Sequence, residues 1–148
     1  MLLTRDSHYL FFASGDGDYP DKVSKFSVNK KEVVAKFKGP AFEEGITSMA
    51  LSPDSNSLYV ATLDELNQFS LKDGKVIHSR NLHDHLDMKG AVISAMRVTQ
   101  NNQYLVTGTI YFDTPAKGTK EELSGKEVVH FGGPVCVWST KDLTLVKT

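Results

Sequence analysis

The segment 81–88 gathers residue types that bind metal ions or move protons, with two histidines and two aspartates within five positions. They are His83, Asp84, His85 and Asp87. Imidazole nitrogens and carboxylate oxygens are metal ligands, and histidine changes its charge near neutral pH. His83 and His85 are only two positions apart, however, and a single loop without a second pair of ligands rarely encloses a metal. The segment therefore predicts a solvated loop with no bound metal, in which His83 and His85 are candidate contacts for a partner protein.

The longest stretch that fits no repeated pattern is 110–133, which contains aromatic, acidic and basic side chains. Long loops on a rigid scaffold often carry function, and aromatic side chains dominate the binding energy of protein interfaces. Tyr111 and Phe112 are therefore candidate anchors for a partner protein, together with the adjacent Asp113. The alternative interpretation of this stretch is a surface insertion without a function.

Other catalytic or ligand-binding motifs are incomplete. The segment 15–21 has the alternating glycines and aspartates of a calcium loop but lacks the glutamate that closes such a loop, so it predicts a turn. The single cysteine, Cys136, lies in the apolar run 134–138 and is expected to be a buried core residue rather than a catalytic thiol. The sequence has no phosphate-binding glycine motif, no nucleophile elbow and no set of acid, base and nucleophile. We therefore predict a protein that is not an enzyme and holds no cofactor.

Composition limits the class of partner. The chain has 148 residues, of which 40% are hydrophobic and 24% charged, as in a folded globular protein. Its 17 basic and 18 acidic residues almost balance, which argues against a nucleic-acid partner, because such surfaces need an excess of positive charge. No stretch is long and apolar enough for a membrane helix, and a lone cysteine favours a reducing compartment. The expected location is the cytoplasm, with no membrane or nucleic-acid contact.

Three segments of the chain repeat one turn pattern. Each has Met, an aliphatic residue two positions on, then Ser or Thr, and Asp or Asn two positions later; the segments are 1–6, 49–54 and 96–101. They start 48 and 47 residues apart, and a β-rich run follows each one. Short hydroxyl and carboxyl side chains bond nearby backbone groups in turns, so each segment predicts a hairpin.

A second repeated pattern follows each of these hairpins. It consists of an aromatic residue, a serine, a polar turn and a β-rich run, and occurs at 24–34, 67–77 and 136–146. Two hairpins make four strands per repeat. The expected strands are 1–3, 46–51 and 92–98 (first), 8–14, 57–62 and 103–110 (second), 23–28, 66–71 and 134–139 (third), and 33–38, 75–80 and 143–148 (fourth). Helical periodicity is weak throughout; 117–123 is the best candidate for a short helix, and 128–131 for an extra strand or part of the next one.

A unit of four strands that repeats every 40 to 50 residues or so is typical of a β-propeller blade. The chain resembles the WD-repeat family of propellers in its Ser52-Pro53-Asp54 turn, in the small residues that end each second strand, and in the run 135–139. The family's Trp-Asp dipeptide is replaced by Phe26-Ser27, Phe69-Ser70 and Trp138-Ser139, so the chain is divergent, and the family's hydrogen-bond network is not carried over.

The expected fold class is all-β, a partial β-propeller of three four-stranded antiparallel blades. The units are 1–45, a partial blade, 46–91, a second blade, and 92–148, a third blade with the inserted loop 110–133. The link before the third blade is expected to emerge at the same end as that loop. The resemblance implies a protein-interaction scaffold without enzymatic activity. The alternative is a propeller enzyme or a propeller that binds a metal or small molecule, with Asp113, His83, Asp84 and His85 as the first candidates.

The first repeat begins inside its first strand, because Met1 aligns with Met49 and Met96. A stack of three blades leaves two apolar faces in water, which costs free energy in proportion to the exposed area. We therefore expect another chain, or a second copy of this one, to complete the propeller.

Overall fold

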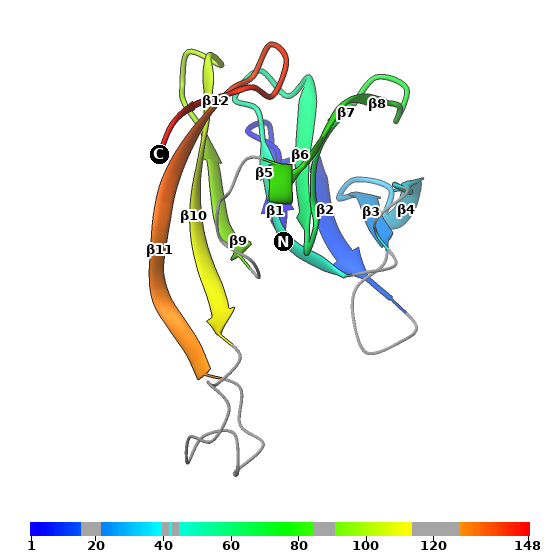
Figure 1. The fold of residues 1–148 in the computed structure, drawn as a ribbon. Helices are drawn as coiled ribbons and strands as arrows, with labels where there is room; N and C mark the ends of the chain where they lie inside the picture. The colour runs from blue at the N-terminus through cyan, green and yellow to red at the C-terminus, as the bar shows by residue number, and fades with distance from the viewer. Residues whose placement is uncertain (16–21, 40–41, 43–44, 85–90, 114–127) are drawn as a thin grey trace.

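The computed structural model describes residues 1–15, 22–39, 42, 45–84, 91–113 and 128–148, and for 111–113 and 128–132 it describes the backbone alone. The described residues form three four-stranded sheets in which each strand pairs antiparallel with the next one along the chain (Figure 1). This confirms the predicted all-β fold of three four-stranded units. No helix in these ranges is long and apolar enough to cross a membrane.

The strands fall close to their predicted positions. The first sheet contains β1 (Leu2–Leu3), β2 (Tyr9–Ser14), β3 (Lys22–Ser27) and β4 (Glu32–Phe37). The second contains β5 (Ile46–Leu51), β6 (Ser57–Thr62), β7 (Glu65–Ser70) and β8 (Val76–Asn81), and the short 3-10 helix η2 (Leu82–Asp84) follows it. The third contains β9 (Ala91–Val98), β10 (Tyr104–Asp113), β11 (Val128–Ser139) and β12 (Leu145–Lys147).

One predicted boundary was wrong, because the loop assigned to 110–133 is partly a hairpin. Strands β10 and β11 continue into it, and their pairing runs to Asp113 opposite Val128. The segment 128–131, for which two interpretations were open, is thus part of the third strand of its sheet. The candidate helix at 117–123 and the calcium-like segment 16–21 lie outside the described residues.

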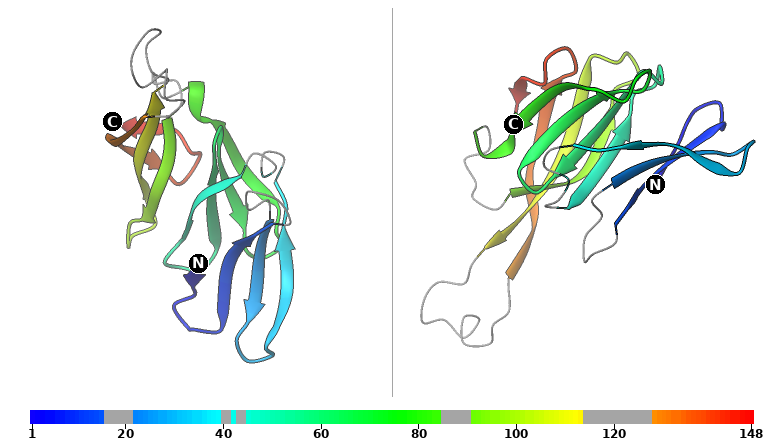
Figure 2. Two further views of the ribbon diagram at one scale, coloured as in Figure 1. Left: turned by 90° about the horizontal axis from the view of Figure 1, so that it is seen from below. Right: turned by 90° about the vertical axis from the view of Figure 1, so that its right-hand side faces the viewer.

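The three sheets stack side by side with the second in the middle (Figures 1 and 2). Their first strands lie along one edge of the stack, where β5 contacts both β1 and β9. The first and second sheets enclose one apolar cluster, and the second and third enclose another. This arrangement, in which each sheet covers its neighbour, is that of a partial β-propeller.

The repeated turns between first and second strands share one set of hydrogen bonds, as their side chains predict. The hydroxyl donates to the Asp or Asn oxygen two positions on, at 2.6, 2.6 and 2.7 Å in the first, second and third sheets. The same hydroxyl accepts the backbone N–H five positions on, at 3.0, 2.9 and 3.0 Å. The residue after the Asp or Asn has a left-handed φ, near 58° in all three. The participants are Thr4, Asp6, Ser7 and Tyr9; Ser52, Asp54, Ser55 and Ser57; Thr99, Asn101, Asn102 and Tyr104.

These turns predict an acid-sensitive contribution to stability. Partial burial raises the pKa of Asp54, but hydrogen bonds from Ser52 and Asn56 outweigh it and hold the pKa below its ordinary value of 3.8. A group with a lowered pKa in the folded state stabilises above its unfolded pKa and loses that contribution as the pH falls through the folded pKa. We expect Asp54→Asn to lose less stability than the wild type below pH 3.8. Urea unfolding at a series of acidic pH values measures this. If the variant and the wild type lost the same free energy of unfolding in acid, the prediction would be contradicted.

The third turn is a natural control for that experiment. It has Asn101 where the others have Asp6 and Asp54, and an amide makes the same hydrogen bonds without titrating. Asn101→Asp should therefore increase the loss of stability in acid.

A row of four apolar residues crosses each sheet at the same register. The rows are Leu3–Leu10–Phe26–Val33, Leu51–Leu58–Phe69–Val76 and Val98–Leu105–Trp138–Leu145. In the second and third sheets the row faces the preceding sheet, and its two middle residues are fully buried. In the first sheet no described residue covers the row, and Leu3 and Val33 are 54% and 44% exposed. We call the row on the first sheet the open row.

The two interfaces between sheets differ in their polar content. The first is aromatic, with Phe69 in contact with Phe37 and Phe42 at ring-centroid distances of 6.1 and 5.5 Å. In the second, the Trp138 indole N–H donates to the buried Thr107 hydroxyl at 3.1 Å. Cys136 is fully buried at this interface, as predicted, and burial raises the pKa of its thiol. A buried, protonated thiol packs as a small apolar group.

Candidate functional site

The structure places one of the predicted histidines in a contact within the second sheet. His83 lies in η2, and its Nε2 is 2.7 Å from Oδ1 of Asp64, in the turn between β6 and β7. The two side chains are 45% and 43% exposed, and the Leu82 backbone N–H donates to the Asp64 carbonyl at 2.7 Å. This contact fixes the segment that leaves β8. The second histidine, His85, lies outside the described residues.

The structure describes the backbone of Tyr111, Phe112 and Asp113 but not their side chains. All three lie in β10, with Tyr111 opposite Ala91 at the start of β9. The backbone therefore places the start of β9 and the end of β10 at one end of the third sheet. This agrees with the expected position of the link before β9, while the role of these residues in partner binding stays a prediction. Within the described ranges, no three His, Cys, Asp or Glu residues lie close enough to hold a metal.

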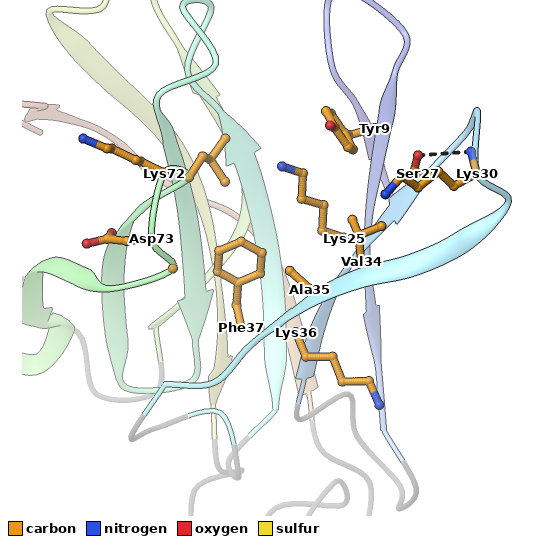
Figure 3. Close-up of a pocket in the computed structure, with 12 residues that line it drawn as sticks. Tyr9, Lys25, Ser27, Lys30, Val34, Ala35, Lys36, Phe37, Lys72 and Asp73 are labelled. Carbon is orange, nitrogen blue, oxygen red and sulfur yellow. Dashed lines mark hydrogen bonds between the residues drawn. The ribbon is translucent and has the colours of Figure 1, made fainter.

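A groove that the sequence analysis missed lies between the first and second sheets (Figure 3). It has a volume of about 420 Å³. One wall comes from β2, β3 and β4, and the other from the turn between β7 and β8. We call it the Lys25 groove. The lining residues used below are Tyr9, Lys25, Phe37, Leu71, Asp73 and Gly74.

Lys25 points into this groove (Figure 3). Its ammonium lies 3.9 Å from the centroid of the Tyr9 ring and 5.9 Å from that of Phe11. A cation above an aromatic face is attracted by the negative face of the ring, by about 0.5 to 1 kcal/mol at an exposed site. None of the ion pairs among the described residues includes Lys25. The ammonium of this partly exposed residue therefore lies against aromatic rings, without a carboxylate partner among the described residues.

The floor of the Lys25 groove is apolar, whereas charged side chains surround it. Phe37 is 3% exposed and forms its floor, with Leu71 beside it. Gly74 has φ of +73°, and a Cβ at this position would meet the Phe37 ring at 3.6 Å. That distance is an ordinary van der Waals contact, so the turn needs glycine at residue 74 for its left-handed φ, which glycine adopts without strain, and not for space beside Phe37.

Charge around the groove is mostly positive. Lys30, Lys36 and Lys72 also line it, and Figure 3 shows the side chains of Lys36 and Lys72 pointing away from Lys25. Asp73 is the carboxylate among its lining residues. A hydrogen bond from Ser70 is the main cause that lowers the pKa of Asp73, and the Lys75 ammonium lies 3.9 Å away. Asp73 is thus held by contacts with residues of its own turn.

The repeat shows what is unusual about Lys25. The register places Lys25, Gln68 and Val137 at the same position of the third strand in the three sheets. At the interface of the second and third sheets, the Gln68 amide donates to Ser57 Oγ at 3.1 Å and to the Tyr59 hydroxyl at 3.2 Å. That position is thus occupied by a neutral side chain with partners inside the protein. The sequence signal was available, since a lysine directly precedes the repeated aromatic only in the first unit.

A second, smaller pocket of about 350 Å³ lies at the turns that follow β5 and β9. Arg5 and Arg97 line it, beside Leu51 and Pro53. Both arginines are exposed, so this pocket offers little beyond a solvated basic rim.

No protein-family model and no curated protein sequence matches this chain. Solved structures match it in fold. Hydrazine synthase of Kuenenia stuttgartiensis aligns with a TM-score of 0.67 and 14% identity over 98% of this chain. The WD40 repeats of RRP9 align with a TM-score of 0.67 and 14% identity over 99% of this chain. The β-propeller domain of Myceliophteria thermophila Cps50 (Swd1) aligns with a TM-score of 0.57 and 16% identity over 87% of this chain.

These likenesses show the fold alone. The three sheets and the two WD-type neighbours fit a partial WD-like propeller. The chain spans about a third of the length of each matched structure, 33%, 36% and 37% in the order given.

Proposed function

We propose that the chain is a protein-interaction scaffold without enzymatic activity, a segment of a WD-like propeller that acts in the cytoplasm. The observation that carries the proposal is the open row on the first sheet. The equivalent rows on the other two sheets are buried by a neighbouring sheet, with Leu58, Phe69, Leu105 and Trp138 at 0% exposed. A face that is buried twice in a repeated structure and open once is a docking surface for one more unit of the same kind.

The occupant that fits the open row is a further four-stranded propeller sheet. Leu3, Leu10, Phe26 and Val33 follow the same pattern of aliphatic and aromatic residues as the rows that such a sheet covers. This chain covers only 33% to 37% of the length of the matched structures, which supports additional sheets in the complete assembly. We propose that another chain or a second copy of this one supplies them, and that nucleic acid and membrane are not partners.

The open row predicts association in solution. We expect the wild-type chain to sediment as more than one copy, because burying apolar surface is favourable by about 25 cal/mol per Å². The double variant Leu3→Ser/Val33→Ser should shift the chain to the monomer without unfolding it, since both side chains are exposed. Sedimentation velocity over a wide range of concentration measures this.

The matched control is Val28→Ser/Leu63→Ser, which removes somewhat less exposed residues outside the row, 42% and 41% exposed against 54% and 44% for Leu3 and Val33. It should sediment as the wild type does. A wild-type chain that stays folded and monomeric at every concentration would contradict the proposal, because the open row would then need no cover.

The alternative function, a propeller enzyme or a metal-binding propeller, stays a prediction. A neighbour named as hydrazine synthase shares the fold, which leaves this alternative open. Stoichiometric metal in the purified protein, lost when His83 and His85 are replaced together, would support it over the scaffold.

A further inference from the structure

We propose that the Lys25 groove binds an acidic segment of a partner protein, with a carboxylate of that segment on the Lys25 ammonium. The inference goes beyond the scaffold proposal, because the groove lies between two sheets that already cover each other, away from the open row. The two proposals can therefore fail independently.

The first step of the argument is the uncompensated charge. An ammonium that lies against an aromatic ring loses hydration on that side, and proteins normally offset such a loss with a carboxylate or with hydrogen-bond acceptors. At the equivalent position of the next interface, Gln68 is neutral and has two hydrogen-bonded partners. Lys25 has aromatic rings beneath it and no carboxylate partner among the described residues. A carboxylate from outside would supply what this position lacks.

The second step is the shape of the groove. Its volume of about 420 Å³ is within the range of sites that hold small ligands or a few side chains. Phe37, Leu71 and the Tyr9 ring give it apolar surface beside the Lys25 ammonium. A segment in which acidic and apolar residues alternate fits this arrangement, because the carboxylate meets Lys25 while an apolar neighbour contacts the partly exposed Leu71.

The third step concerns the class of ligand. Lys30, Lys36 and Lys72 add positive potential at the rim, which favours a segment with several acidic residues. Nucleic acid would instead need cations spaced along its backbone and exposed rings on which bases can stack. Here one ammonium covers the Tyr9 ring, and Phe37 is buried. The geometry therefore favours an acidic protein segment.

A binding experiment with a defined probe tests the inference on the full 148-residue chain. The probe is a fluorescein-labelled peptide with the core Glu-Leu-Glu-Phe-Glu-Leu-Glu, and the comparison peptide has Gln at each Glu. Fluorescence anisotropy should show binding of the acidic peptide that weakens with salt. We expect Lys25→Gln to weaken it about tenfold, which corresponds to about 1.4 kcal/mol.

Two variants keep the result interpretable. Lys25→Arg keeps the charge and should retain binding within about a factor of three, which corresponds to about 0.65 kcal/mol. Lys75→Gln removes a lysine of the neighbouring turn that does not line the groove, and should bind as the wild type does. Lys25→Gln introduces the residue that the second sheet has at this position, so it should fold and sediment as the wild type does.

Three results would overturn the inference. The first is that the wild-type chain does not bind the acidic peptide, or binds the Gln peptide equally well. The second is that Lys25→Gln leaves the affinity unchanged. The third is that a labelled oligothymidine binds more tightly than the peptide and depends on Lys25 in the same way, because the ligand would then be a nucleic acid.

Discussion

Phe69→Ala is expected to lower the free energy of unfolding by about 3 to 5 kcal/mol, the usual cost of removing a buried phenylalanine from a core. The Phe69 side chain is fully buried and contacts the rings of Phe37 and Phe42 from the first sheet and the link after it. Its removal leaves a cavity at the interface of the first two sheets rather than within one of them. Urea unfolding monitored by circular dichroism measures the loss.

The matched control for this experiment is Phe26→Ala, at the same position of the open row. Phe26 pairs with Leu10 and Val33, but no described sheet lies over it. We expect Phe26→Ala to lower the free energy of unfolding by less than half as much as Phe69→Ala, at protein concentrations where the chain is monomeric. Equal costs for the two variants would mean that the open row is as well packed as the covered row, which would contradict the proposed docking surface.

Much of this architecture follows from short-range chemistry, which is why it could be predicted from the sequence. The turn after each first strand depends on a hydroxyl and an Asp or Asn only two positions apart, as in Ser52 and Asp54. These side chains find their partners whatever the neighbouring sheets do. Alternation of apolar residues then places the strands within a few residues of their observed bounds, except at the β10–β11 hairpin, where β11 begins at Val128 instead of residue 134.

The features that were missed depend on contacts between distant parts of the chain. The Lys25 groove forms because the turn containing Gly74, from the second sheet, lies against Phe37 of the first. No local pattern around Lys25 shows which side chains will face it. The extension of β10 and β11 likewise depends on pairing between Asp113 and Val128, across a segment that looks irregular in sequence.

The candidate site shows the same difference between local features, which could be predicted, and long-range contacts, which could not. The segment with His83 attracted attention for its residue types, and the structure gives that histidine a contact with Asp64, nineteen positions earlier. Sequence reasoning identified the side chain but not its partner, because the contact joins two different links of the sheet.

The second large effect is expected at the other interface, where Trp138→Phe should cost about 2 kcal/mol. The variant removes the indole N–H that donates to the buried Thr107 hydroxyl at 3.1 Å, and it leaves a smaller side chain in a fully buried position. Thr107→Val removes the acceptor of the same hydrogen bond and should cost about 1 to 2 kcal/mol.

The repeat supplies the combination that should rescue these losses. The second sheet has Phe69 and Val60 at the positions of Trp138 and Thr107, and both residues are fully buried there without a polar group in either side chain. Trp138→Phe/Thr107→Val copies that pair, so the buried side-chain donor and acceptor disappear together. Groups in direct contact typically couple by about 0.5 to 3 kcal/mol in a double-mutant cycle. We therefore expect the double variant to cost at least about 1 kcal/mol less than the sum of the two single costs in urea unfolding. Simple additivity would show that this hydrogen bond, which joins β10 and β11 within the third sheet, contributes nothing to stability.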